Sequence, residues 1–586
     1  MILQSLAEYY DTLVEKGILA TPGWQLEKVS FALVINEGGS LIRIDDLRQE
    51  EVVGKTKKMM PRQLIVPARE KRSVNICSNF LCDNATYLLG LDTKDKPNRA
   101  ELCFKECARM HQDLLKNTNS NAAIAIKKFF QQWNPKLAAH HVLITPIQKE
   151  LGTANLVFEF DGRFVQEDAA CRAAWDQQQT KSDDDTFMQC LITGERSPIA
   201  ILHPSIKGIP GAQSSGASLV SFNARAFESY GQQDGQGRNA PVSEKAAFAY
   251  SAALQWMINS PKHHTRLGDM TIVYWAETAN DGMDALLSLL LNDDEKTIDQ
   301  SSLHQTIVKL ASGQTVDWND FPIKPANRYY ILGLSPNAAR LSVRFFQRDT
   351  FGSLAEHVAQ FNAETRIIHA IFEKDTLPLW QLLRETANQQ SKKKEASPQL
   401  AGDMLRAVIT GKRFPETLFN QLQLRLRAEC GDVTYGKAAL IKAYLTRNGS
   451  FLQTIAKEAL TVELNDQTDY APYLLGRLFA ILEKTQQAAN PDINTTIRDR
   501  YFTSACATPS VIFPRLISLS QAHVKKLKNT MPGAAINYSK LFDDIMGRLT
   551  SSFPSRLSLQ DQGIFQIGYY HQKQQFFNKK EDKENV

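Results

Sequence analysis

The pattern of hydrophobic residues changes near residue 400, and this change most limits the folds open to the chain. Before it, short apolar or alternating runs typical of strands are mixed with helical segments; the clearest runs are residues 29–35, 41–44, 141–144, 155–160 and 271–275. After it, helical spacing predicts helices over 401–411, 415–429, 436–446, 450–460, 471–488, 494–507, 511–528 and 534–550. The chain is therefore predicted to be α+β: a mixed N-terminal body with short antiparallel sheets and helices, followed by an all-helical C-terminal bundle.

A chain of 586 residues is too long for one hydrophobic core. We expect an N-terminal α+β domain over residues 1–390, an exposed polar linker over 391–400 and a helical bundle over 401–586. No apolar run reaches the roughly 18 residues that span a bilayer, and the N-terminus lacks a signal-peptide pattern. Eight cysteines are too few for a disulfide scaffold in a chain of this length. These features predict a cytoplasmic protein with reduced thiols and no membrane partner.

Basic residues are concentrated between residues 53 and 72. The whole chain has a formal net charge of only +5, from 68 basic and 63 acidic residues. This stretch has one acid, Glu70, and seven bases: Lys55, Lys57, Lys58, Arg62, Arg69, Lys71 and Arg72. Such clusters bind phosphate backbones through Coulomb attraction and counterion release. We interpret the stretch as a nucleic-acid contact; the alternative is an ordinary solvated surface.

Two groups of polar residues are candidates to read base edges. Asn75, Asn79 and Asn84 directly follow the basic stretch, and side-chain amides carry both a donor and an acceptor. Residues 203–240 are rich in Gly, Ser, Gln and Asn, and loops of this length are commonly functional. Within this loop the candidates are Gln213, Ser214, Ser215, Asn223 and Arg225. The alternative is that these residues only form turns.

Two more basic groups follow later in the chain. Residues 340–350 favour a strand with three arginines on one face and three apolar residues on the other: Arg340, Arg344 and Arg348 against Leu341, Val343 and Phe345. In the helical part we expect a basic ridge outside the apolar stripes, formed by Arg477, Lys484, Lys525, Lys526 and Lys528. Such ridges can follow a nucleic-acid backbone, although an ordinary bundle with a solvated outer face gives the same pattern.

The sequence contains no convincing catalytic constellation. Cys103 and Cys107 are four residues apart, but no second Cys/His pair lies at zinc spacing, and Cys190 with His203 cannot close a tetrahedral site. The acidic run at residues 183–185 is interpreted as a solvated loop rather than a two-metal site. The glycine-rich loop lacks the Gly-Lys-Ser/Thr ending that cradles a nucleotide. We therefore expect no catalysis, no metal and no cofactor.

Five stretches, taken in order, resemble the large-subunit family of type I-C CRISPR Cascade surveillance complexes. They are MPRQLIVPARE with NFLCDNATYLLGLD, the long segment from CLITGERSPIA to FNARAFESYG, YYILGLSPNAARLSVRFF, YLLGRLFAILEKTQ and IGYYHQKQQFF. The resemblance covers nearly the whole chain. Each stretch alone is a weak signal, but five in order are specific.

The resemblance implies a role that composition does not supply. Members of that family act in a guide-RNA complex, recognise the motif that flanks the protospacer in duplex DNA, and support R-loop formation. The implied partners are CRISPR RNA, double-stranded target DNA, backbone and small subunits, and a separate helicase-nuclease. Base pairing with the guide reads the rest of the target, as in other RNA-guided effectors.

The resemblance also makes residues 462–586 small-subunit-like. No Met lies between Met404 and Met531, so a separate product would have to start near Val462 at a non-AUG codon. Two other functions stay open: a metal-dependent nuclease or nucleotide-binding factor, and a pure protein scaffold.

Overall fold

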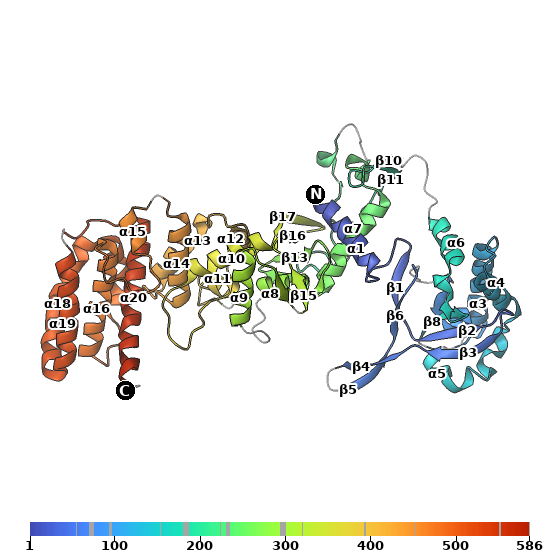
Figure 1. Cartoon of the computed structure of the whole chain (residues 1–586), viewed down its shortest axis with the longest axis horizontal. Coiled ribbons are helices and arrows are strands. Elements are labelled where there is room, and N and C mark those ends of the chain that lie inside the picture. Colours follow the sequence, from blue (N-terminus) through green and yellow to red (C-terminus); the bar gives the residue numbers. More distant parts are fainter. Residues whose placement is uncertain are drawn as a thin grey trace. The chain divides into compact units, whose positions relative to one another are not determined.

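Figure 1 shows the computed structural model of the chain. The chain divides into two compact units. Unit 1 comprises Met1–Ile206 and Ser218–Trp256, and unit 2 comprises Lys207–Ala217 and Met257–Val586. The chain therefore passes between the units three times, and none of these places is the expected linker at 391–400. The structure describes the whole chain except residues 54–55, 70–75, 93–96, 153, 180–186, 223, 230–234, 293–299, 319, 392–393, 451, 550–551 and 585–586.

Unit 1 is built around a five-stranded sheet in the order β3-β2-β8-β7, with β9 also paired to β8. Its strands are β2 (Phe31–Ile35), β3 (Leu41–Asp46), β7 (Cys82–Asn84), β8 (Asn155–Phe160) and β9 (Arg163–Phe164). β2 and β8 are parallel, and the other pairs are antiparallel. The strands predicted at 29–35, 41–44 and 155–160 are confirmed, apart from Ser30, which separates β1 from β2.

Alternation along these strands gives the sheet two buried faces. Leu33 and Phe158 pack into a core with helices α3 (Pro97–Leu115), α4 (Asn121–Gln132) and α6 (Ala169–Gln179). Ala32 and Val157 point to the other face. There they meet an antiparallel ribbon formed by β1 (Trp24–Val29) and β6 (Arg62–Pro67). The ribbon is thus anchored to the sheet by its own apolar residues.

The remaining elements of unit 1 are shorter or lie at the ends of the unit. They are α1 (Ile2–Glu15), β4 (Gln49–Val53), β5 (Thr56–Met60), α2 (Ala85–Leu88), α5 (Gln148–Leu151), β10 (Phe187–Gln189), β11 (Arg196–Pro198) and most of α7 (Glu244–Asn259). The long loop at 203–240 is confirmed. Apart from bridge residues, its described part has only the 3-10 turns η5 (Arg225–Phe227) and η6 (Gln236–Asn239).

The strand predicted at 141–144 is wrong. These residues form a turn in which the Ile144 amide donates to the His141 carbonyl at 2.9 Å, and a 3-10 helix, η2 (Thr145–Ile147), follows. Pro146 lies in that helix, has no N–H to give to a sheet and fixes its φ near the helical range. The proline therefore favours the turn over the strand suggested by the apolar residues.

Unit 2 begins with a four-stranded antiparallel sheet in the order β12-β13-β16-β17. The strands are β12 (His264–Leu267), β13 (Met270–Ala276), β16 (Arg328–Asn337) and β17 (Arg340–Thr350), beside a small hairpin of β14 (Val316–Trp318) and β15 (Phe321–Ile323). One face packs on α8 (Asp281–Asn292), α9 (Gln300–Ala311) and α10 (Phe351–Thr365). Trp275 and Tyr330, which alternate with the residues of that face, stack at 5.1 Å between ring centroids.

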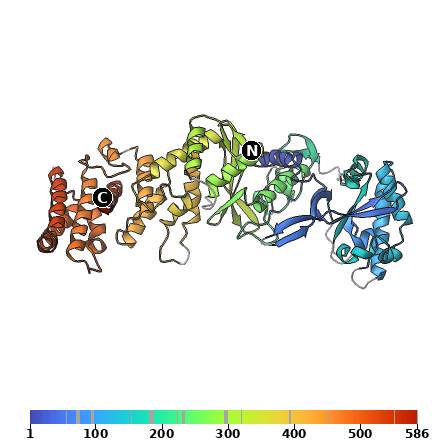
Figure 2. The same ribbon diagram turned by 60° about the horizontal axis from the view of Figure 1, so that its bottom comes forward.

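The rest of unit 2 is helical, as predicted. The helices are α11 (Leu379–Arg384), α12 (Pro398–Thr410), α13 (Glu416–Ala428), α14 (Tyr435–Asn448), α15 (Thr454–Glu458), α16 (Ala471–Ala489), α17 (Ile497–Ala507), α18 (Pro509–Thr530), α19 (Pro532–Arg548) and α20 (Leu559–Glu584). α20 was not among the helices predicted. Figures 1 and 2 show α18 beside α19 and α16 beside α20. No helix in the described residues is long and apolar enough to cross a membrane.

Glycines allow α16 and α20 to cross with their backbones in contact. A Cβ added to Gly476 would lie 2.0 Å from the Phe565 carbonyl oxygen, and one added to Gly568 would lie 2.2 Å from the Tyr473 carbonyl oxygen. Neither helix backbone can give way cheaply at such distances. α20 also contacts the helices before residue 462, because Gln566 and Gln423 of α13 exchange side-chain hydrogen bonds of 2.8 and 2.9 Å. The region 462–586 therefore shares its core with residues 361–460.

Candidate nucleic-acid interface

The basic stretch at 53–72 supplies one strand to each of two antiparallel ribbons: β5 pairs with β4, and β6 pairs with β1. β4 and β5 pair antiparallel with Lys57 opposite Val52 and Lys58 opposite Glu51, and Pro61 leads directly into β6. A two-stranded ribbon of this kind fits the major groove of DNA. Lys55, Lys71 and Arg72 lie outside the described residues, as do the side chains of Lys57 and Lys58.

The two arginines of this stretch that the structure describes differ in role. Arg62 is exposed, and its guanidinium lies 5.8 Å from the centroid of the Phe164 ring. Arg69 instead lies 3.3 Å from the Glu27 carboxylate and 3.6 Å from that of Asp83, which is fully buried. A buried carboxylate needs such a partner, because an unpaired charge in the interior is costly. Arg69 therefore ties the β1–β6 ribbon to the sheet, so not all of the charge counted in the sequence faces solvent.

The described asparagines that follow the basic stretch have structural roles. Asn79 is 4% exposed, and its backbone amide donates to the Asp83 carboxylate at 3.0 Å. Asn84 caps helix α2 by accepting a hydrogen bond of 3.1 Å from the Thr86 amide. The prediction that Asn79 enters a groove is corrected by its burial, and Asn84 is already engaged in a cap. Asn75 lies outside the described residues.

The glycine-rich loop places its two candidate groups in different units. Gln213, Ser214 and Ser215 are exposed on a turn of unit 2, closed by the Gly216 amide donating to the Gln213 carbonyl at 2.9 Å. The turn rests on the sheet, since a Cβ on Gly211 would lie 3.1 Å from Pro336. Arg225 is exposed in unit 1, and Asn223 lies outside the described residues.

The arginines of β17 are only partly available. Arg344 donates to the Ser335 hydroxyl at 3.0 Å, and Arg348 lies 3.7 Å from the Glu277 carboxylate and 5.7 Å from the Tyr330 ring centroid. Arg340 is half-buried. The register shifts here, because Phe345 pairs with Gly333 while Val343 pairs with Leu334. This β-bulge breaks the predicted alternation: Phe345 faces the core under the sheet, whereas Val343, on the other side of the bulge, is 42% exposed.

The C-terminal basic residues also separate into two kinds. Arg477 is 3% exposed and donates to the Gln572 side chain of α20 at 3.0 Å, so its predicted place on an outer ridge is wrong. α20 covers it, and burial lowers the pKa of its guanidinium. Lys525, Lys526 and Lys528 are exposed on α18, where Lys526 donates to the Asn490 side chain at 2.8 Å. Lys484 is half-buried beside α20.

The cysteines and histidines weighed as catalytic candidates have structural partners. The Cys107 thiol lies 3.5 Å from His111, which is buried and accepts a hydrogen bond from the Leu81 amide. Burial opposes ionisation of Cys190, but hydrogen bonds from Ser243 and Thr193 prevail and lower its pKa to about 7. His203 bonds instead to the Tyr250 hydroxyl, 2.7 Å away.

Among the residues that the structure describes, no group of three or more His, Cys, Asp or Glu could hold a metal. The acidic run at 183–185 lies outside them.

The family comparison decides what kind of protein presents these surfaces. A family model described as CRISPR-associated protein (Cas_Csd1) matches residues 6–577. The chain belongs to this CRISPR-associated family. The match includes both units and every described candidate residue named above. A search of curated proteins found no match for this CRISPR-associated chain.

Proposed function

We propose that the chain is the non-catalytic large subunit of a type I-C CRISPR RNA-guided complex in the cytoplasm. It recognises the motif that flanks the protospacer in duplex DNA, supports R-loop formation and recruits a separate helicase-nuclease. The observation that carries the proposal is the family match over residues 6–577, joined to the five stretches that resemble the large subunit. CRISPR RNA, backbone subunits and small subunits are the proposed partners.

Within this role the β4–β5 ribbon and Arg62 are the proposed phosphate contacts, because they combine bases with a shape that fits a groove. The exposed amide and hydroxyls of Gln213, Ser214 and Ser215 are the proposed base contacts. Asn79 does not belong to that set because it is buried. The division follows a general rule that phosphate contacts position a protein on DNA while base contacts specify the sequence.

The test uses the complex assembled with guide RNA and backbone subunits, and duplexes with and without the flanking motif. Lys57→Ala, Lys58→Ala and Arg62→Ala together should weaken binding to both duplexes and reduce the salt slope by about 2.7, because each phosphate that a base no longer neutralises lowers the slope by about 0.9. Gln213→Ala with Ser214→Ala should instead reduce only the preference for the motif.

The matched control removes the same charge elsewhere on unit 1, by Lys116→Ala, Lys149→Ala and Arg163→Ala, all exposed. It should bind as the unaltered complex does. Equal weakening in the control and the test variant would show a general charge effect and overturn the ribbon assignment. A complex without any motif preference would overturn the proposed function itself.

A further inference from the structure

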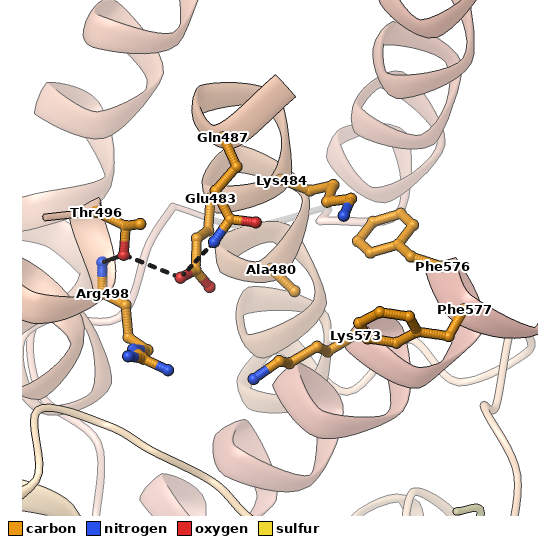
Figure 3. Close-up of a pocket in the computed structure, with 9 residues that line it drawn as sticks. All are labelled: Ala480, Glu483, Lys484, Gln487, Thr496, Arg498, Lys573, Phe576 and Phe577. Carbon is orange, nitrogen blue, oxygen red and sulfur yellow. Dashed lines mark hydrogen bonds between the residues drawn. The ribbon is translucent and has the colours of Figure 1, made fainter. Parts of the chain in front are cut away.

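A small pocket lies between α16, α17 and α20 in unit 2 (Figure 3). Its volume is about 110 Å³, and its lining residues are Ala480, Glu483, Lys484, Gln487, Thr496, Arg498, Lys573, Phe576 and Phe577. Drug-sized ligands occupy pockets of roughly 300 Å³ or more. This one is therefore too small for a whole drug-sized molecule and suits one small unit of a longer ligand.

The carboxylate in the pocket, that of Glu483, already accepts hydrogen bonds from within the protein. Glu483 is 6% exposed, and its carboxylate accepts hydrogen bonds from the Tyr569 hydroxyl at 2.6 Å and the Thr496 hydroxyl at 3.0 Å. The Gln487 amide donates a third, at 3.3 Å (Figure 3). Arg498 is also engaged, with Asp432 at 3.3 Å. The internal partners of Glu483 lower its capacity to bind a cation from outside.

The ligand-facing chemistry is cationic and aromatic. The Lys484 ammonium lies 5.7 Å from the centroid of Phe577, which is 49% exposed. Lys573 lies one turn before Phe577 on α20, with its ammonium 5.9 Å from the Tyr569 ring centroid. Exposed rings beside lysines are the elements by which proteins hold single strands, with bases stacked on the rings and phosphates near the charges.

We propose that this pocket binds one nucleotide of a single-stranded nucleic acid, with the base on Phe577 and the phosphate between Lys484 and Lys573. The inference rests on the proposed function only in that an R-loop exposes a single strand. It concerns a different surface from the ribbon, and nothing in its test depends on a flanking motif.

The test measures binding of the full chain to labelled single-stranded DNA and RNA of one mixed sequence. Lys484→Ala with Lys573→Ala should weaken binding and reduce the salt slope by about 1.4, because each charge that neutralises a single-strand phosphate contributes about 0.7. Phe577→Ala should weaken binding at least about fivefold without changing the slope, whereas Phe577→Tyr should keep the affinity. The DNA and RNA arms show which strand the pocket prefers.

Lys457→Ala, an exposed lysine of α15, is the charge control and should change the affinity less than about twofold. Thermal melting shows whether each variant is folded. Because Phe577 is 49% exposed, we expect its replacement to leave the fold intact. Unchanged binding in Phe577→Ala would overturn the inference, because the lysines would then act as general charge. Loss of co-purifying protein subunits with full oligonucleotide binding would also overturn it, in favour of a protein contact. Failure of motif recognition leaves this result unaffected.

Discussion

At the scale of single residues, His571 on α20 is held neutral inside the fold. It is fully buried, with Nδ1 2.8 Å from the Tyr473 hydroxyl. Burial, reinforced by the nearby charges of Lys442 and Arg477, lowers its pKa from 6.5 to about 3. Below pH 6.5 the unfolded chain therefore binds a proton that the folded chain refuses, and stability decreases. The contribution of the neutral His571 to the free energy of unfolding is therefore fully present above about pH 6.5 and is lost as the pH falls toward 3.

Replacing His571 should accordingly flatten the acid side of the stability profile. Between pH 7 and pH 5 this histidine lowers the free energy of unfolding of the unaltered chain by about 2 kcal/mol. The free energy of unfolding of His571→Gln should therefore decrease by about 2 kcal/mol less over the same range. Urea unfolding at the two pH values measures the difference. His140→Gln, at an exposed position, should leave the pH dependence unchanged. An identical pH dependence in His571→Gln and the unaltered chain would contradict the assignment.

The sequence shows which side chains are basic or carry amides, but it did not predict which of them are exposed. Arg69, Asn79 and Arg477 were each assigned to a surface by local composition. In the fold, segments distant in the sequence contact or cover these residues. The Asn155 side chain accepts a hydrogen bond of 3.1 Å from Arg69, and the Gln572 side chain accepts one from Arg477. A helical period places Arg477 outside the stripe of its own helix, but it gives no sign that α20 covers that side.

At the scale of elements, the contact between α16 and α20 depends on Gly476 and Gly568. Gly568→Ala would put a methyl group 2.2 Å from a backbone oxygen of α16, which the packed helices can relieve only by separating. Overpacking of this kind costs about 1–3 kcal/mol. We expect a decrease of that size in the free energy of unfolding, measured by urea denaturation.

Gly547→Ala supplies the control in α19. Nothing lies within 4 Å of its added Cβ, so the variant tests helix propensity alone. It should be neutral or stabilise by up to about 1 kcal/mol, because glycine is less favourable than alanine within a helix. Equal destabilisation in both variants would contradict the close-contact argument.

The helices were predictable where one face carries the apolar residues, as in α12. α20 was missed because two glycines and a run of aromatic and amide residues obscure its helical period, and it is buried on several sides. The parallel pairing of β2 with β8 joins strands that lie far apart in the chain, so no local turn sequence predicts it. The bulge at Arg344 was equally hidden, since alternation assumes an unbroken register.

At the scale of the whole molecule, each unit has a core of its own. Phe158 belongs to the core of unit 1 and meets the Phe129 ring at 5.1 Å, while Gly568 lies in the helical core of unit 2. Multidomain chains commonly unfold in more than one step. We therefore expect two transitions in calorimetry of the full chain, although the chain passes between the units three times.

Two substitutions assign the transitions. Phe158→Ala, which removes a fully buried ring at a cost of about 3–5 kcal/mol, should lower the melting temperature of only one transition. Gly568→Ala should lower only the other. Because the ribbon lies in unit 1 and the nucleotide pocket in unit 2, the same pair of variants shows whether each surface can be disturbed separately. A single transition that both substitutions lower would show instead that the two units unfold as one cooperative body.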